Sequence, residues 1–228
     1  MELRIKYYGH SCFMVQTEGK SILFDPFISP NPLAEAIDVS TIIPDFIFIS
    51  HGHGDHIADA VQIAKQSKAQ VIATYEVCEW LKNQGIENFI PMNTGGSIDL
   101  SFFKVKLVYA SHSSSMPDGT YGGNPVGFVF KTPSHQFYYA GDTALTYEMK
   151  LIKEEFKLDF AFLPIGDHFT MGVKDALKAA EFVGCNTVVG MHFDTFPPIQ
   201  INHKEAVSLF SSAGRKLIIP EINNTLEF

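Results

Sequence analysis

The sequence lacks long apolar runs, and this absence excludes one class of protein. No stretch approaches the roughly 18 consecutive apolar residues that a membrane-spanning helix needs. The first ten residues, MELRIKYYGH, also lack the charged start and apolar core of a signal peptide. We therefore expect a cytoplasmic protein with no membrane partner.

Cysteine is also scarce. The 228 residues include only three, Cys12, Cys78 and Cys185. Their odd number and wide spacing give neither a disulfide framework nor a CxxC metal site. We expect each to be a small buried hydrophobic residue in a reducing compartment, which agrees with the cytoplasm.

Basic residues are outnumbered as well, with 17 Lys and Arg against 25 Asp and Glu, for a net charge of −8. A chain of this charge is a poor partner for nucleic acid, so we expect a small-molecule substrate instead. Hydrophobic residues make up 46% of the chain. This length and content suit one large core, so we predict a single domain over residues 1–228 and leave a homo-oligomer open.

Strand-like and helix-like patterns alternate along the chain. The run DFIFIS is typical of a strand that is covered on both faces. Similar patterns predict strands within residues 3–9, 11–17, 21–27, 45–50, 70–74, 103–110, 126–132, 136–142, 159–165, 187–192 and 216–220. Helical spacing or composition predicts helices within residues 58–68, 76–85, 147–156, 173–184 and 204–214. The order indicates an α/β protein with two β-rich layers and helices outside.

The segment IFISHGHGDHI, residues 47–57, places three histidines and one aspartate within six positions. A lone histidine is usually a satisfied core or surface residue, but this H-x-H-x-D-H spacing at a strand end is hard to explain in that way. We expect the cluster on a loop, where Gly52 and Gly54 leave room for a tight path. Neutral imidazole and carboxylate groups are natural ligands for a divalent transition ion.

Three further residues follow predicted strands elsewhere in the chain. His112 follows KLVYAS, Asp142 follows QFYYAG, and His192 follows TVVGM. Because strand ends gather on one rim of a layered fold, we predict that these three side chains complete the metal centre.

This combination of motifs resembles the metallo-β-lactamase superfamily. The segments YYGHSCF, ILFDPF, PIGDHFTMG and MHFDTFPPI are similar to its branch of small metal-dependent hydrolases related to L-ascorbate-6-phosphate lactonase. The resemblance implies a four-layer αββα sandwich, the metallo-β-lactamase fold, with metals at one edge of the paired sheets.

The resemblance also implies two divalent ions and no organic cofactor. One ion would be held by His51, His53 and His112, the second by Asp55, His56 and His192, with Asp142 bridging both. True β-lactamases commonly carry cysteine where this chain has Asp142, so antibiotic hydrolysis is not the expected role. Zinc is the first expectation, and the carboxylate bridge also admits manganese, iron or nickel.

The implied enzyme is a metal-dependent hydrolase. Two ions would ionise a shared water, and the resulting metal-bridged hydroxide would attack a small ester or lactone, phosphorylated or not. The resemblance makes Asp55 a candidate for a catalytic role in proton handling. His168 follows the predicted strand DFAFLPI, so we expect substrate contact or proton donation from it.

Three residues have weaker claims on the site. His10 lies in a predicted turn, where a packing role and a site role are equally open. Asp25 ends a predicted strand, and we expect it to orient a ligand histidine. Asp167 is either a supporting partner for the site or an ordinary turn residue.

Two other functions stay open. The first is a phosphodiesterase or nuclease, which the acidic composition and the lack of an evident basic arm argue against. The second is a metal-binding or redox module without hydrolysis. Iron in the purified protein, with no hydrolytic turnover, would favour that alternative.

Overall fold

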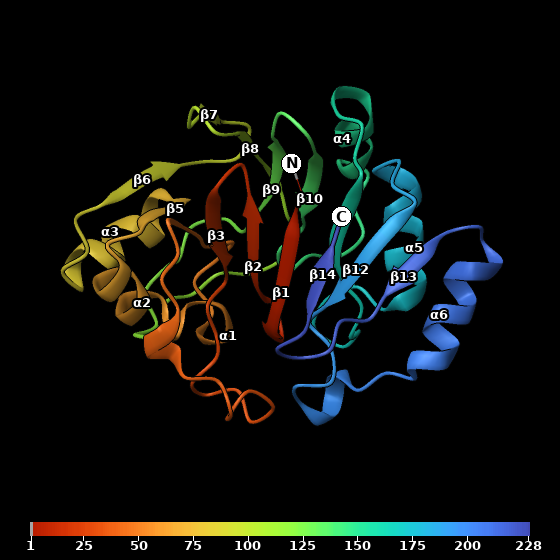
Figure 1. Cartoon of the computed structure of the whole chain (residues 1–228), viewed down its shortest axis with the longest axis horizontal. Coiled ribbons are helices and arrows are strands. Elements are labelled where there is room, and N and C mark those ends of the chain that lie inside the picture. Colours follow the sequence, from red (N-terminus) through yellow and green to blue (C-terminus); the bar gives the residue numbers. More distant parts are fainter. Residues whose placement is uncertain (1) are drawn as a thin grey trace.

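The computed structural model describes residues 2–228 and forms two seven-stranded sheets with helices outside them (Figure 1). The strand orders are β14-β1-β2-β3-β4-β5-β6 in the first sheet and β13-β12-β11-β10-β9-β8-β7 in the second. This arrangement confirms the expected α/β sandwich. Among these residues, no helix combines the length and the apolar character needed to cross a membrane.

The first sheet begins with antiparallel hairpins and continues as a parallel sheet from β3 to β6. Its strands are β1 (Arg4–Gly9), β2 (Cys12–Thr17), β3 (Lys20–Phe24), β4 (Phe46–Phe48), β5 (Gln70–Thr74), β6 (Phe89–Met92) and β14 (Thr225–Glu227). The helices of this half are η1 (Val39–Thr41), α1 (Gly54–Ile57), α2 (Ala60–Ser67) and α3 (Tyr75–Asn83).

The second sheet mirrors this plan, with antiparallel strands β7 to β10 followed by parallel strands β10 to β13. Its strands are β7 (Ser97–Asp99), β8 (Lys104–Tyr109), β9 (Val126–Lys131), β10 (Gln136–Tyr139), β11 (Phe160–Pro164), β12 (Thr187–Met191) and β13 (Lys216–Ile218). The helices of this half are α4 (Met149–Glu155), α5 (Val173–Phe182), η2 (Pro197–Ile199) and α6 (His203–Ser212).

Aromatic rings fill much of the space between the sheets. Phe24 of the first sheet stacks on Tyr139 of the second with ring centroids 4.5 Å apart, and Phe48 meets Phe130 at 4.9 Å. All four side chains are fully buried. Aromatic pairs of this kind stabilise a core by about 0.5–1.5 kcal/mol each beyond the area they bury. The strands therefore form a rigid base for the loops at their ends.

The parallel strands bring distant residues to one edge of the sandwich, which we call the site edge. Asp25 directly follows β3, and His192 directly follows β12. His51 and Asp142 each lie three residues beyond the ends of β4 and β10. Because the carboxyl ends of parallel strands share an edge of their sheet, the topology alone gathers these side chains at the lower edge of the view in Figure 1.

Most of the elements expected from the sequence are confirmed, and the three cysteines are buried as expected. Three strands were not expected. The short strands β7 and β14 lie at sheet edges with few buried residues, so their apolar pattern is weak. Strand β6, also at an edge, contains Pro91, which weakens a strand pattern.

Candidate metal centre

Four imidazoles converge on one carboxylate oxygen. The Oδ2 atom of Asp142 lies 3.0 Å from Nε2 of His192, 3.3 Å from Nε2 of His56, 3.6 Å from Nε2 of His112 and 4.0 Å from Nε2 of His51. Asp142 is almost fully buried. Residues from both sheets therefore meet around a single acidic group.

The two halves of the histidine motif have different backbone structures, because helix α1 begins inside the motif. His53 is the extended N-cap residue of α1, and Asp55 and His56 lie in the first turn of that helix. The expectation of a loop throughout is therefore wrong for the second half of the motif. A Cβ at Gly52 would collide with the sulfur of Met116 unless that side chain moved, whereas a Cβ at Gly54 would meet open space.

The donor atoms form three groups among the described residues, each with its atoms within 4.8 Å of one another. The first group is His51, His53 and His112, and the second is His10, Asp55, His56 and His192; these two have the division that the resemblance implied, with His10 added to the second. The third group, Asp25, His51 and His56, takes one histidine from each of the other two. Asp142 contacts members of the first and second groups, as a bridging ligand would.

Three buried polar atoms in this cluster have no hydrogen-bond partner among the described residues. They are Nε2 of His56, Nδ1 of His192 and Oδ1 of Asp142. An unsatisfied buried polar group costs about 1–3 kcal/mol, so native proteins seldom keep several together. Nε2 of His56 and Oδ1 of Asp142 are both possible ligand atoms, so the residues present fit divalent metal ions.

The protonation states also suit metal binding. Burial lowers the pKa of His51, His53 and His112, so these imidazoles are neutral at pH 7. Burial alone would raise the pKa of Asp142, but His192 and His56 hold it well below its usual range. Metal ligands must be deprotonated in this way to donate a lone pair.

His56 is the exception among the histidines of this cluster. Burial lowers its pKa, but the surrounding carboxylates Asp142, Asp25 and Asp55 outweigh burial and raise it well above its usual value. Negative charge therefore exceeds positive charge around this imidazole. Either a proton or a bound cation at Nε2 restores the balance.

One carboxylate, Asp25, orients histidines of the first and second groups. Its Oδ2 atom lies 2.9 Å from Nδ1 of His56 and accepts a hydrogen bond of 2.6 Å from the Ser50 hydroxyl. That hydroxyl lies 2.9 Å from Nδ1 of His51, and Tyr139 donates a further hydrogen bond of 2.7 Å to Asp25. Asp25 thus lies beside ligand histidines, where the sequence placed it.

This network fixes which nitrogen of each ring carries hydrogen. A carboxylate only accepts hydrogen bonds, so Nδ1 of His56 must carry hydrogen, and Nε2 is the atom that remains for a proton or a cation. The Ser50 hydroxyl donates to Asp25, so it accepts from Nδ1 of His51; Nε2 of His51, which lies 3.0 Å from Nδ1 of His53, then keeps a lone pair. Partners of this kind orient metal-binding histidines in many proteins.

His10 lies within the cluster and not in a merely packed turn. Its Nε2 atom is 3.2 Å from Oδ2 of Asp55, and its ring centroid is 4.2 Å from that of His192. Burial is the main cause that lowers the pKa of His10 to about 4, so the ring is neutral at pH 7. The contacts favour the site role for this residue.

The structure does not bring Asp167 and His168 to the ligands. Both are exposed and have left-handed backbone conformations, and they line a separate hollow of about 720 Å³ beside the starts of α5 and α6. No hydrogen bond or ion pair within residues 2–228 joins either side chain to a ligand. The prediction that residues after a strand lie at the site edge is correct for the backbone here, since Gly166 packs against the His192 carbonyl. The turn at residues 167 and 168, however, directs these two side chains away from the cluster. Their roles stay predictions.

Three supporting residues were not found from the sequence. Ser50 and Tyr139 hold Asp25, and Thr195 lies 3.0 Å from Nδ1 of His10. In the sequence, only its position next to His51 could have indicated a role for Ser50. The loop SHSSS, residues 111–115, also reaches the site, since Ser113 Oγ lies 3.4 Å from Nε2 of His53 and Ser114 accepts a hydrogen bond from Gly52.

This fold and cluster define a metal-binding member of the β-lactamase superfamily. The model of the beta-lactamase superfamily domain matches residues 20–193 of the chain. A UPF0173 metal-dependent hydrolase from Methylacidiphilum infernorum is 50% identical over 208 residues, covering 91% of this chain and 92% of that protein. Another from Flavobacterium johnsoniae is 48% identical over 225 residues, covering 99% and 100%.

A solved structure agrees with these matches. The metallo hydrolase Igni18 from Ignicoccus hospitalis superposes with a TM-score of 0.90 at 34% identity, covering 100% of this chain and 99% of that one. The chain belongs to the UPF0173 metal-dependent hydrolases within the β-lactamase superfamily. It is therefore a metal-dependent enzyme, and His and Asp groups that could hold the metal are present.

Proposed function

We propose that this hydrolase holds two divalent ions and uses water to cleave a small, uncharged ester or lactone. The observation that carries the proposal is the pair of donor groups around the Asp142 carboxylate. The first group, His51, His53 and His112, alone offers three ligands, which is enough for one ion. The second group and the Asp142 carboxylate between the two therefore support a second ion.

In this proposal each ion has its own ligands. His51, His53 and His112 would hold the first ion, Asp55, His56 and His192 would hold the second, and Asp142 would serve both. When bound, such ions lower the pKa of a coordinated water and polarise the bond under attack. Zinc is the first candidate, and manganese, iron and nickel also suit histidine and carboxylate ligands.

The chain's own polar groups have distinct parts in the proposed reaction. Asp55 is partly exposed at 29% of its side chain, whereas Asp142 and His192 are buried. Burial alone would raise the pKa of Asp55, but His56 and His10 lower it far below its ordinary value, so the carboxylate is ionised. It is therefore available as an anionic ligand at the accessible side of the cluster, and a pKa this low makes it a weak proton acceptor. The exposed Ser113 hydroxyl beside His53 is placed to donate a hydrogen bond to a substrate oxygen.

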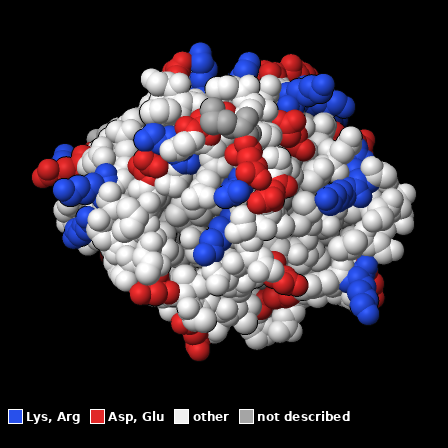
Figure 2. Space-filling view, viewed as in Figure 1, with Lys and Arg blue, Asp and Glu red and all other residues white. Residues whose placement is uncertain are grey.

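The loops around the centre favour an uncharged substrate. The segments 25–33, 51–60, 110–125, 140–147, 165–172 and 192–203 contain no Lys or Arg. In Figure 2 the Lys and Arg side chains in view lie above the lower margin or toward its right end, and Asp and Glu lie along that margin. Arginine and lysine are the usual partners of a phosphate group. A phosphate remote from the scissile bond would therefore find no such partner on these segments.

A panel of matched substrates tests the proposal. The protein is reconstituted with Zn²⁺, Mn²⁺ or Ni²⁺ and assayed with lactones and esters, their phosphorylated counterparts, a phosphodiester and a β-lactam. We expect the uncharged esters or lactones to react fastest. Turnover should vanish with a chelator and in His53→Ala, but persist in the control His135→Ala, a residue of the β9–β10 turn.

The other outcomes separate the competing functions. Turnover that survives both the chelator and His53→Ala overturns the metal mechanism. If the phosphodiester reacts fastest, the protein is a phosphodiesterase. If the phosphorylated lactone reacts fastest, the inference that the loops favour an uncharged substrate is wrong. The non-hydrolytic module is disfavoured already, because the relatives are metal-dependent hydrolases.

A further inference from the structure

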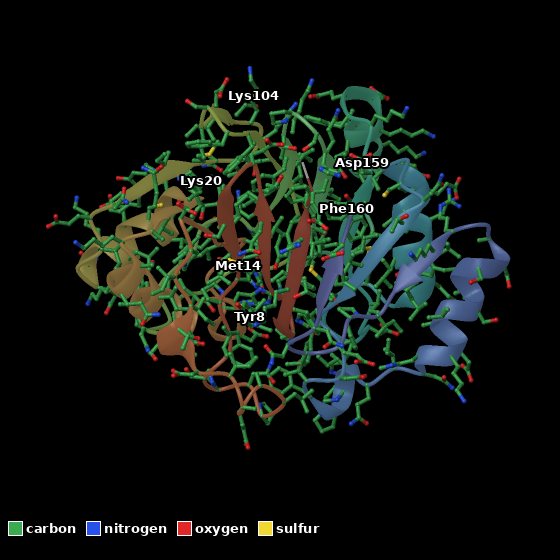
Figure 3. All side chains as sticks on the ribbon, viewed as in Figure 1. Tyr8, Met14, Lys20, Lys104, Asp159 and Phe160 are labelled. Carbon is green, nitrogen blue, oxygen red and sulfur yellow. The ribbon has the colours of Figure 1, made fainter. Side chains whose placement is uncertain are left out.

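His10 lies between the two halves of the second donor group. Asp55 belongs to α1, which follows a strand of the first sheet, and His192 follows β12 of the second sheet. His10 lies in the turn between β1 and β2, and its side chain is completely buried. In Figure 3 the label of Tyr8 marks the lower end of β1, two residues before His10. This turn therefore reaches ligands from both sheets.

The main chain of His10 is hydrogen-bonded to His192, the residue that follows β12 of the second sheet. The His192 N–H donates a hydrogen bond of 2.9 Å to the His10 carbonyl, and the Tyr7 hydroxyl donates to the same oxygen at 3.1 Å. Both His10 and His192 have left-handed backbone conformations, with φ of 56° and 54°. Such conformations persist only where surrounding contacts enforce them. The hydrogen bond between the two main chains therefore fixes the position of the His192 backbone.

The side chain of His10 contacts Asp55, which follows the first sheet, and Thr195, which follows the second. Nε2 lies 3.2 Å from Oδ2 of Asp55, and Nδ1 lies 3.0 Å from Oγ1 of Thr195. Since a carboxylate only accepts, Nε2 carries the hydrogen and donates it to Asp55. Nδ1 then accepts from the Thr195 hydroxyl, whose other acceptor, the Phe193 carbonyl, is farther away at 3.3 Å. The rings of Phe27 and Phe196 pack at 5.5 and 5.6 Å from the imidazole and restrict its tilt.

Both nitrogens of His10 are thus satisfied by protein atoms. His56 differs, because its buried Nε2 atom has no hydrogen-bond partner among the described residues. This contrast separates His10 from the ligands, although it lies within the same group of donor atoms. A fully hydrogen-bonded imidazole needs no ion.

We propose that His10 is a positioning residue that sets the Asp55 carboxylate and the His192 backbone in register, so that the second ion finds a preformed site. The inference rests on the dinuclear centre proposed above. It predicts a selective effect, because the first group of ligands, His51, His53 and His112, makes no hydrogen bond to His10 in the described structure.

Two amide variants of different reach test this role. In His10→Asn the amide can replace Nδ1 but not Nε2, and asparagine tolerates a left-handed conformation. In His10→Gln the longer side chain carries its amide to the position of Nε2. Bound Co²⁺ is counted by elemental analysis, its visible spectrum is recorded, and the affinity of each ion is measured against a chromophoric chelator. Circular dichroism checks folding.

We expect His10→Asn to bind one of the two ions, the second, about 10–100-fold less tightly, the range found for lost outer partners of metal ligands. The other ion should be unaffected, and His10→Gln should restore most of the lost affinity. Thr195→Val leaves the contact to Asp55 in place, so it should weaken the second ion less than His10→Asn does.

The outcomes separate this inference from the proposed function. A wild-type protein that binds no ion overturns the metal centre itself. An Asn variant that binds every ion as tightly as the wild type overturns the role of His10 and leaves the centre intact. Equal losses in the Asn and Gln variants, or the loss of both ions together, also overturn the positioning role, because a general disturbance explains them.

Discussion

The two edges of the sandwich differ in how their polar groups are satisfied. At the site edge, buried histidines and carboxylates crowd together, and several of their polar atoms have no hydrogen-bond partner within residues 2–228. At the opposite edge, exposed or partly exposed charges form ion pairs such as Lys20 with Asp45 at 2.9 Å and Lys104 with Asp99 at 3.0 Å. Figure 3 labels Lys20 and Lys104 in the upper part of the view and Tyr8 near the lower edge.

Backbone conformation shows the same contrast. Among the described residues, ten that are not glycine have positive φ. Six of them lie in loops at the site edge, namely His10, Asp25, Asp167, His168, His192 and Asp194. Strained conformations and unsatisfied groups reduce stability, and proteins retain them where function requires them. The comparison teaches that the site edge is arranged to bind an ion and the opposite edge to close the fold.

The largest effect should come from Asp142→Asn, which removes the charge at the centre of the site edge. The variant leaves four imidazoles around a neutral amide, whose nitrogen is no ligand. We expect metal affinity and hydrolytic rate to fall by more than about 100-fold, beyond the range for outer partners. Elemental analysis and the ester assay measure both. Wild-type metal content in this variant would remove the reason to treat the two edges as different.

An intermediate effect should follow from Asp25→Asn, which touches no proposed ion directly. All partners of this carboxylate donate to it, so an amide nitrogen would face the donors of His56, Ser50 or Tyr139. We expect a loss of metal affinity of about 10–100-fold. Chelator competition measures it.

Tyr139→Phe is the matched control for that variant. It removes one hydrogen bond to Asp25 and leaves the carboxylate in place, so its effect on metal affinity should be smaller. A phenylalanine variant that binds metal as weakly as Asp25→Asn would show that packing, and not the carboxylate, orients the histidines.

Much of the site could be predicted from the sequence because its ligands obey two simple rules. Histidine and aspartate are the residue types that bind divalent ions, and strand ends share an edge. His112, Asp142 and His192 satisfied both rules, and the structure brings them together. The topology of two parallel segments could be inferred for the same reason, since buried strands alternated with helices.

The remainder depends on contacts that no local pattern encodes. His168 also follows a strand, but a left-handed turn directs its side chain toward the hollow beside α5 and α6. Ser50 and Thr195 are common hydroxyl residues whose importance comes only from the histidines they meet in space. Side-chain direction after a strand and partners across sheets are therefore the limits of the sequence argument.

The smallest effect should come from Asp45→Asn at the opposite edge. Partial burial raises the pKa of Asp45, but hydrogen bonds from Ser21 and Lys20 outweigh it, and the pKa falls below its ordinary value of 3.8. A carboxyl group with a lowered folded-state pKa stabilises the fold above its unfolded pKa, and this stabilisation is lost as the pH falls through the folded value. At pH 7 we expect Asp45→Asn to lower the free energy of unfolding by about 0.2–1 kcal/mol, since the pair is solvent-screened. Thermal unfolding of chelated protein should show this difference at pH 7 and a smaller one below about pH 3.8, while metal affinity at pH 7 stays at the wild-type value. A change in metal affinity as large as that of Asp25→Asn would mean that the two edges are coupled, and the distinction between them would fail.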